Sequence, residues 1–428
     1  GSDWVHDIPW LYTNKPAGAR AVLSTVAGSM ITVAGVTFSM TILSISSTTT
    51  QLGPRLLRNF MRDRGNQITL GVFISTFLYC LLVLRTVRNG EGSMDATKGI
   101  AEFVPHVAVM TGLLLAIASV GVLIYFIHHI PESIHVSNVV AVVGRDLKSQ
   151  IDEQFPSQIG FPAESEPERS PKAELTSGFA KTARRVTAQG SGYVQVVDSD
   201  GLLKIATTHD LVLHLCCRPG DFVTEGSLLM LASPSDRVDD DLARLLAGTY
   251  AWGTQRTNTQ NLRFLFSQLI DVIARALSPG VNDPITAQNC LDWIRAALET
   301  LAERQMPDAY RYDENQQLRV IAEPENFASF LAHVCDQLRP YVSTDFNATR
   351  HMMQMLSQVV SRATTDDRRR AIARQAGSLR REFRRFSQDV RGRRQIDDQY
   401  RRLIQLVRDG SFRQRVRDSG HWIGGRAA

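Results

Sequence analysis

Residues Val104–Ile127 read VPHVAVMTGLLLAIASVGVLIYFI, a run that contains no lysine, arginine, aspartate or glutamate. The hydrocarbon core of a bilayer is about 30 Å thick, and a helix needs roughly 20 apolar residues to cross it. Two earlier runs, Ala21–Ser44 and Ile68–Leu84, fall in the same length range. The sequence therefore predicts three transmembrane helices within residues 21–130.

The placement of arginine predicts how these spans are oriented. The connection after the first span carries four arginines against a single aspartate: Arg55, Arg58, Arg62, Arg64 and Asp63. Positively charged connections stay on the cytoplasmic side. We therefore expect residues 1–20 outside the cytoplasm and all of the chain after Ile127 inside it. None of the three runs has the cleavage site of a secretory signal.

A line of polar residues distinguishes the first span. Its members recur every three or four residues, which places them on one helical face; they are Thr37, Thr41, Ser44, Thr48, Gln51 and Arg55. Hydroxyl groups are tolerated in lipid where helices pack closely or where a helix faces water. Two interpretations stay open: helix packing, or a pore with Arg55 at its cytoplasmic mouth. Gly28 and Gly35 add a small-residue surface, and a homo-oligomer assembled on this helix would satisfy both interpretations.

The chain after the third span changes character. Pro131–Gln154 has helical spacing of apolar residues, and a linker rich in proline, serine and glutamate follows it, so residues 131–174 are expected to form an exit helix and linker. Four residues at the membrane exit could ligate a metal: His128, His129, Glu132 and His135. Interfacial histidines and a helix that starts with Pro-Glu explain the same residues without a metal, and we predict no metal.

Residues 175–236 predict a small β-rich module. Tyr193–Val197 and Leu211–Leu215 alternate as strands do, and the spacing of the residues between them is helical. The segment Arg218–Leu229, RPGDFVTEGSLL, is similar to the half-motif of lipoyl-type domains, although no lysine stands at the turn. We therefore expect a lipoyl-like barrel that carries no prosthetic group.

Residues 237–364 predict a helical domain with one β-hairpin at Tyr310–Ala322. Two of its helices meet in RALSPGVNDPITAQ, Arg275–Gln288. An arginine suits the last turn of a helix, Pro-Gly ends it, and Asn or Asp before Pro284 caps the next helix. A structural corner explains these residues, while an anion site at the helix N-terminus stays open; the residues concerned are Arg275, Ser278, Asn282 and Asp283.

Residues 365–428 predict a basic helical tail. Between Asp366 and Ala428 stand 18 arginines and 8 acidic residues, whereas the whole chain has a net charge of +5, so the remainder is acidic. Such a tail can meet nucleic acid, anionic lipid or an acidic face of its own oligomer. Because no nucleic-acid motif accompanies it, we expect anionic headgroups or self-contact rather than nucleic acid.

The sequence offers no pattern for catalysis or for a cofactor. The five cysteines are odd in number and have no CxxC spacing, which indicates free thiols rather than disulfides or a zinc site. No GxSxG, HExxH or Walker pattern occurs. No histidine lies near Ser278 or Asp283 in the sequence to act as a base. We therefore predict that the protein is not an enzyme and binds no cofactor.

Two long strings resemble a known family. Thr32–Arg85 and Arg275–Asp292 look like bacterial predicted membrane proteins grouped as domain of unknown function 2254, and the SGYVQ and PGDFVTEG pieces resemble it too. The resemblance covers about Gly18 to Glu303. It implies a multi-span protein of the bacterial inner membrane with a soluble C-terminal half, and it implies no activity. The family typically has more membrane-spanning chain than Gly1–Arg20 provides, which implies a further span upstream.

The expected fold is therefore an α+β integral membrane protein, with a helical transmembrane bundle, a small β module and a mainly helical cytosolic domain. The expected function is a homo-oligomeric channel or pathway for ions or small solutes, lined by the polar line of the first span and gated by the cytosolic domain. The alternative is a membrane-anchored scaffold or regulatory protein whose β module and basic tail bind partners or lipid.

Overall fold

The computed structural model describes residues 15–52, 64–88, 103–155, 179 and 182–419; of residues 47–52 and 130–134 it describes only the backbone. The chain divides into two compact units, Gly1–Val139 and Val140–Ala428. Each unit has its own hydrophobic core.

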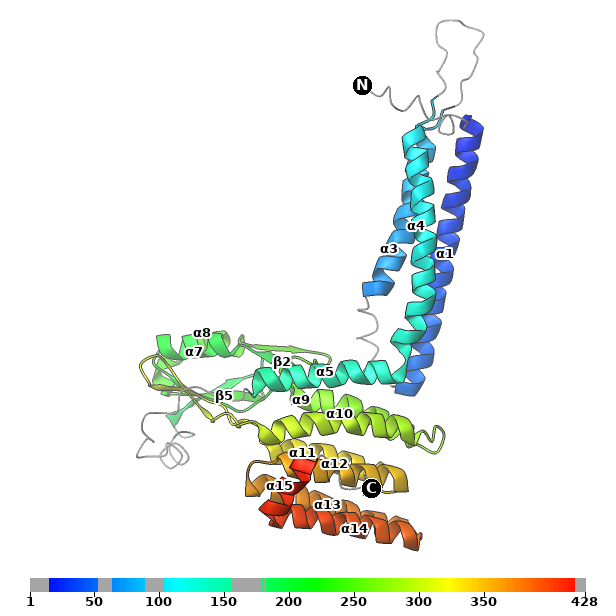
Figure 1. Cartoon of the computed structure of the whole chain (residues 1–428). Helices are drawn as coiled ribbons and strands as arrows, with labels where there is room; N and C mark the ends of the chain where they lie inside the picture. Colours follow the sequence, from blue (N-terminus) through cyan, green and yellow to red (C-terminus); the bar gives the residue numbers. More distant parts are fainter. Residues whose placement is uncertain (1–14, 53–63, 89–102, 156–178, 180–181, 420–428) are drawn as a thin grey trace, which may run out of the picture. The chain divides into compact units, whose positions relative to one another are not determined.

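The first unit contains three long helices, α1 (Pro16–Leu52), α3 (Arg64–Thr86) and α4 (His106–Ile134), which run alongside one another (Figure 1). Each contains a segment that is long and apolar enough to cross a membrane: Pro16–Ser46, Arg64–Thr86 and His106–His129. These segments contain the three apolar runs of the sequence almost completely. The prediction of three helices able to span a membrane is thereby confirmed in length and composition.

Small side chains let these helices approach closely. Ala19 and Ala27 of α1 are buried against Cys80 of α3 and Val109 of α4. Gly112 of α4 is so close to α1 that an added Cβ would lie 3.3 Å from Leu23. The outward faces are apolar, with exposed Phe38, Leu43, Leu82, Leu114 and Ile117. Large exposed apolar surfaces of this kind are what a lipid environment requires.

The third span does not end at Pro131. Helix α4 continues to Ile134, the chain leaves helical geometry at His135, and α5 (Val136–Gln154) begins directly after it. Proline lacks the N–H that would bond one turn back, yet α4 continues for three residues beyond it. The exit helix therefore starts five residues later than expected.

Eight strands in the described part of the second unit form two open sheets. The five-stranded sheet has the order β1-β5-β3-β8-β7 and the three-stranded sheet the order β4-β2-β6. The strands are β1 (Arg184–Thr187), β2 (Gly192–Val197), β3 (Val212–Leu215), β4 (Phe222–Val223), β5 (Leu228–Ser233), β6 (Tyr250–Gly253), β7 (Tyr310–Tyr312) and β8 (Leu318–Ile321). Short α7 (Ser199–Thr208), η4 (Ser235–Arg237) and α8 (Asp240–Ala247) connect some of them.

The expectation of a lipoyl-like barrel is wrong. The described strands leave edges at β1 and β7 and at β4 and β6, so neither sheet closes. The two strands predicted from the sequence are present as β2 and β3, but they lie in different sheets. Strand β3 has a parallel partner in β8, which comes about a hundred residues later. The half-motif does correspond to a local strand–turn–strand segment, in which the turn at Gly226 joins β4 to β5. A local pattern cannot reveal a partner so far along the chain.

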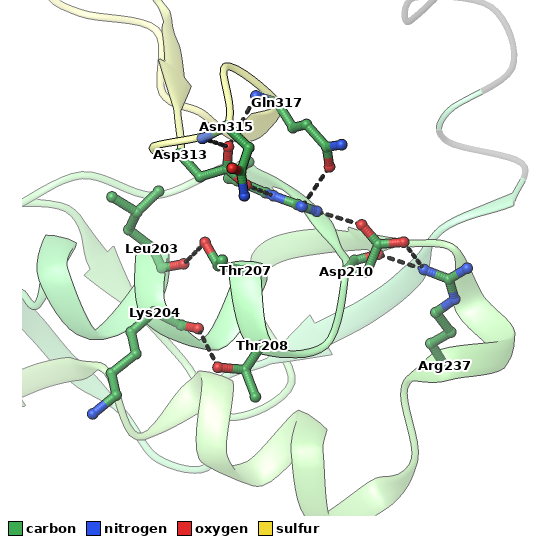
Figure 2. Close-up of polar contacts among 10 residues, drawn as sticks. Leu203, Lys204, Thr207, Thr208, Asp210, Arg237, Asp313, Asn315 and Gln317 are labelled. Atoms are coloured by element: carbon green, nitrogen blue, oxygen red, sulfur yellow. Dashed lines mark hydrogen bonds and ion pairs between the residues drawn. The ribbon is translucent and has the colours of Figure 1, made fainter.

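The predicted hairpin at Tyr310–Ala322 is confirmed and belongs to the five-stranded sheet. β7 and β8 pair in antiparallel fashion, and the turn closes through the N–H of Gln316 and the carbonyl of Asp313. Arg319 of β8 then donates to Asp313 (Nε–Oδ2, 2.7 Å) and to Asp210 (Nη1–Oδ1, 2.6 Å) after α7. Figure 2 shows Asp210 between Arg237 and the hairpin residues. This buried arginine ties the hairpin to the earlier part of the chain.

The remaining helices stack beside these sheets as α9 (Leu262–Ala276), α10 (Pro284–Glu303), α11 (Phe327–Val342), α12 (Phe346–Arg362), α13 (Asp366–Phe386), α14 (Val390–Arg408) and α15 (Gly410–Ser419). In Figure 1 they run from green to red as a layered array. Helices α9 and α12 are buried on most of their faces. The helix predictions for residues 237–364 are therefore confirmed.

The basic tail is a packed part of this array. Ile372 and Phe383 of α13 and Ile396 and Leu403 of α14 are buried, and both helices contact α12. Several of its arginines also bond the last carbonyls of helices, which have no partner within the helix. Arg368 donates to the carbonyls of Ala302 and Arg304, both at 2.8 Å, at the end of α10. Part of the positive charge is thus used to stabilise the fold itself.

Candidate functional site

The polar line of the first span points partly into the helical bundle. Thr37 and Thr41 are only 2% and 3% exposed. The Thr37 hydroxyl donates to the carbonyls of Val33 and Ala34, both at 2.9 Å. The Thr41 hydroxyl lies 2.8 Å from the carbonyl of Thr37 and 3.2 Å from Asn66 Oδ1 on α3. These two hydroxyls are therefore bonded inside one copy of the chain.

The other members of the line are less informative. Ser44 is half-buried. The side chains of Thr48 and Gln51, and all of Arg55, lie outside the described residues. A second polar contact in the bundle was not predicted: Thr76 on α3 and Ser119 on α4 are both buried, with their hydroxyls 3.2 Å apart.

The corner at Arg275–Gln288 holds its polar residues in local bonds. Asp283 is the N-cap of α10; its carboxylate accepts from the Thr286 N–H at 3.1 Å and from the Thr286 hydroxyl at 2.6 Å. These bonds lower the pKa of Asp283. Ser278 donates to the carbonyl of Arg275 at 2.6 Å, and Asn282 takes a positive φ of 49°. Asp283 occupies the amide position that an anion would need.

The histidines at the membrane exit are spread apart. His128 and His135 are exposed, and the His129 ring stacks on Tyr125 with centroids 5.0 Å apart. The side chain of Glu132 lies outside the described part of the chain. Within that part, no three histidine, cysteine, aspartate or glutamate side chains gather in a group that could hold a metal ion.

A cleft of about 690 Å³ lies inside the second unit, where the sheets meet α9 and α11. Its volume falls in the range of small-molecule sites. Four segments form its walls: Cys216–Asp221 after β3, Arg256–Ser267 around the start of α9, Pro307, and Glu323–His333 at the start of α11, joined by Gln154 and Phe155 at the end of α5. No motif in the sequence predicted this cleft.

Two arginines in the cleft hold a carboxylate between them. Arg263, in the first turn of α9, contacts Glu325 Oε1 through Nε at 2.5 Å. Arg218, after β3, contacts the same oxygen at 3.7 Å. Glu325 is only 17% exposed at its side chain. Arg263 also donates to the Ser329 hydroxyl at 2.5 Å, which fixes the guanidinium to α11.

A third arginine faces the cleft without such a partner. Arg256 donates from Nε to the carbonyl of Gly220 at 3.1 Å and lies 4.9 Å above the ring of Tyr193. No described carboxylate forms an ion pair with it. Gly220 has a φ of +99°, and a Cβ there would collide with the side chain of Asn261, which caps α9. Only glycine lets this turn pack against the helix start.

His333 lines the cleft, and both nitrogens of its ring have polar neighbours. Gln337 Nε2 lies 3.0 Å from His333 Nδ1, and His333 Nε2 lies 3.1 Å from the Ser267 hydroxyl, which donates to the carbonyl of Arg263 at 2.8 Å. Because the Ser267 hydroxyl donates its proton to that carbonyl, it acts as the acceptor for the N–H at His333 Nε2. Burial, with the nearby charges of Arg263 and Arg256, lowers the pKa of His333.

Helix α5 packs against other parts of the second unit. Gly144 packs directly on Trp293 of α10, where an added Cβ would overlap the indole ring. The rings of Phe155 and Phe330 meet edge to face with centroids 5.9 Å apart, and both line the cleft. Asp152 forms an ion pair with Arg304. The helix that follows the third span thus contributes directly to a wall of the cleft.

Comparisons with known proteins agree with the membrane part of this description. The family model "Predicted membrane protein (DUF2254)" matches residues 2–358, further than the segment that carries the sequence resemblance. Uncharacterised proteins of Mycobacterium tuberculosis and Mycobacterium bovis are each 33% identical over 370 residues, covering 85% of this chain and 68% of theirs. No solved structure matches the chain. The chain belongs to the DUF2254 family of predicted membrane proteins.

Proposed function

We propose that the protein is a membrane-anchored regulatory protein, in which packed transmembrane helices hold a ligand-responsive unit at the membrane. It is a multi-pass protein of the bacterial inner membrane, and its second unit lies in the cytoplasm, as the arginine-rich connection at residues 55–64 favours. In this proposal, α5 couples ligand binding in the cleft to the transmembrane helices.

The observation that carries this proposal is the packing of Thr37 and Thr41. A hydroxyl that lines a pore must face water, whereas these two are 2% and 3% exposed and bonded to their own helix or to Asn66. Threonine in a transmembrane helix can satisfy its hydroxyl on a carbonyl one turn back. The packing of Thr37 and Thr41 supports a helix–helix contact at this part of the polar line, as a membrane anchor would need.

The path for regulation follows from chain order. A single residue, His135, separates α4 from α5. Gln154 at the end of α5 and the following Phe155 line the cleft beside Phe330. A ligand that changes the packing of Phe155 acts on a helix that is covalently continuous with the third span. A ligand can shift a conformational equilibrium only if it contacts the two conformations differently. The end of α5 is a position where such a difference in ligand contact can arise.

Flux measurements distinguish the anchor from a channel. The full chain is reconstituted into liposomes and assayed for K⁺, Na⁺ and Cl⁻ movement, with protein-free liposomes as the control. We expect no flux above the control. Ion flux that disappears in Thr37→Val/Thr41→Val, a substitution that keeps shape but removes both hydroxyls, would overturn the anchor and support the pore.

Orientation has its own test. Cys216 is exposed in the second unit, whereas Cys290 and Cys335 are buried. A variant that keeps Cys216 and replaces the neighbouring Cys217 with serine is treated with a membrane-impermeant thiol reagent. We expect labelling only after the inner membrane is opened; labelling of intact spheroplasts would place this unit outside.

A homo-oligomeric channel remains the second candidate because α1 has an open small-residue face. Nothing lies within 4 Å of a Cβ added at Gly28 or Gly35, and Thr32 and Ser39 on the same face are exposed. Faces of this kind allow close helix–helix contact between copies. Gly35→Leu should dissociate an oligomer assembled on this face, whereas Gly71→Leu on α3 is the matched control. An assembly that is insensitive to both would exclude this face.

Anionic lipid is the partner we propose for the basic tail. Arg370 and Arg401 are largely exposed, although each pairs with an aspartate one turn away. Such pairs are weak at a surface, so headgroups can compete with them. Binding of the protein to phosphatidylglycerol vesicles should fall as salt rises; binding that ignores salt would contradict this contact.

A further inference from the structure

We propose that the cleft binds a small molecule that carries an oxyanion group, phosphate or carboxylate, between Arg218 and Arg263, and that Glu325 holds this position when the cleft is empty. The inference names the ligand of the proposed regulatory function and rests on that function for its role. Binding itself is measured separately from ion flux, so the two proposals can fail independently.

The arginines of the cleft come from separate parts of the chain. Arg218 follows β3, Arg256 precedes α9, and Arg263 lies in its first turn. Planar guanidinium groups match the geometry of carboxylate and phosphate. The start of α9 also lines the cleft, and its cap Asn261 already accepts the Phe264 N–H, so the positive charge comes from the guanidinium groups. Two segments of the chain thus bring three arginines to the cleft.

Glu325 shows the chemistry that this wall accepts. Its Oε1 contacts both Arg263 and Arg218, at 2.5 and 3.7 Å, where a ligand oxygen would sit. The other acids of the cleft do not compete there. Asp221 accepts the backbone N–H of Arg218 at 2.9 Å and closes the local turn, and Glu323 is exposed without an ion pair to any described residue.

The rest of the cleft specifies a ligand larger than a simple ion. Its volume of about 690 Å³ exceeds what one phosphate fills, and Phe155, Leu262, Phe264 and Phe330 line it. Ligand sites combine apolar walls with a few placed polar groups. The ligand that we propose therefore carries an oxyanion at the arginines and extends along the cleft past Phe155 and Phe330.

Displacement of Glu325 gives the proposal a gain-of-function test. Full-length protein in phosphatidylcholine nanodiscs is titrated with inorganic pyrophosphate by calorimetry at constant ionic strength. Glu325→Gln removes the internal competitor and should bind pyrophosphate about tenfold more tightly than the wild type, about 1.4 kcal/mol. Glu323→Gln is the matched control, because it changes the net charge equally but frees no arginine; its affinity should stay within about twofold.

Loss of an arginine should have the opposite effect. Arg263→Gln and Arg218→Gln, placed in the Glu325→Gln background, should each weaken pyrophosphate binding about tenfold or more. Thermal unfolding of each variant reports whether the fold is kept. The Glu325→Gln gain cannot arise from misfolding, so it decides the question if the arginine variants fold poorly.

Three results would overturn the proposal. Equal gains in Glu325→Gln and Glu323→Gln would indicate general electrostatics rather than a site. If neither the wild type nor Glu325→Gln binds pyrophosphate, the cleft has no oxyanion-binding position. Weaker pyrophosphate binding in nanodiscs that contain phosphatidylglycerol would assign the arginines to a lipid headgroup instead of a free small molecule; unchanged binding supports the free ligand.

Discussion

Replacing Gly144 with alanine tests the docking of α5. An alanine Cβ would lie 2.8 Å from Trp293 Cγ and closer still to two other ring carbons, whereas ordinary contacts begin at 3.4 Å. Helix α5 must therefore move away from α10 or the indole must turn. Overpacking of this kind costs about 1–3 kcal/mol, while alanine in a helix gains about 1 kcal/mol over glycine.

The overlap involves a rigid ring, so we expect the upper part of that range and a net loss of about 2 kcal/mol. Since roughly 2–4 °C accompanies each kcal/mol in domains of 150–250 residues, the transition of the second unit should fall by about 4 °C. Differential scanning calorimetry of the full chain in detergent measures it.

The Trp293→Ala background supplies the control for this prediction. With the ring removed, Gly144→Ala should become neutral or stabilising by up to about 1 kcal/mol, because only its helix propensity remains. A rise in the transition temperature of the single Gly144→Ala variant would refute the reasoning. It would mean that α5 does not lie against Trp293 as described.

Three further predictions concern the second unit. Asp283→Ala should lower stability by about 1 kcal/mol by removing the cap of α10; no change would contradict the cap. Burial lowers the pKa of His333 in the folded protein, so stability should fall as pH drops below the ordinary pKa of 6.5, and His333→Gln should flatten that fall in pH-dependent calorimetry. Arg319→Met should lower the transition temperature more than Arg237→Met, because Asp313, 4% exposed, would lose its ion-pair partner; equal losses would contradict this.

The membrane part could be predicted because its signal is local. A run such as Val104–Ile127 carries its own evidence, since backbone groups in lipid must be satisfied within the segment. The corner around Asp283 could also be predicted, because caps depend on residues three apart. Both signals need no knowledge of which segments meet in space.

The cleft could not be predicted because its walls meet only after the chain has folded. Arg218 and Glu325 are brought together by the parallel pairing of β3 with β8, whose register joins Leu213 to Val320. The available hints were separate: Gly220 in a Pro-Gly-Asp turn, and Asn261 before an apolar helix. Neither indicates that the two pack against each other.

The polar line of α1 shows why periodicity alone could not choose between a pore and an anchor. A threonine hydroxyl can bond the carbonyl one turn back in its own helix whether it faces water or protein. The sequence pattern of Thr37 and Thr41 is therefore the same for a pore and for an anchor. Only the neighbouring residues distinguish the two cases, and the contact of Thr41 with Asn66 of α3 favours the anchor that we propose. A pore lined by Thr41 would require this contact to break. In the anchor that we propose the contact is kept, and the proposed coupling runs through α5, whose end lines the cleft.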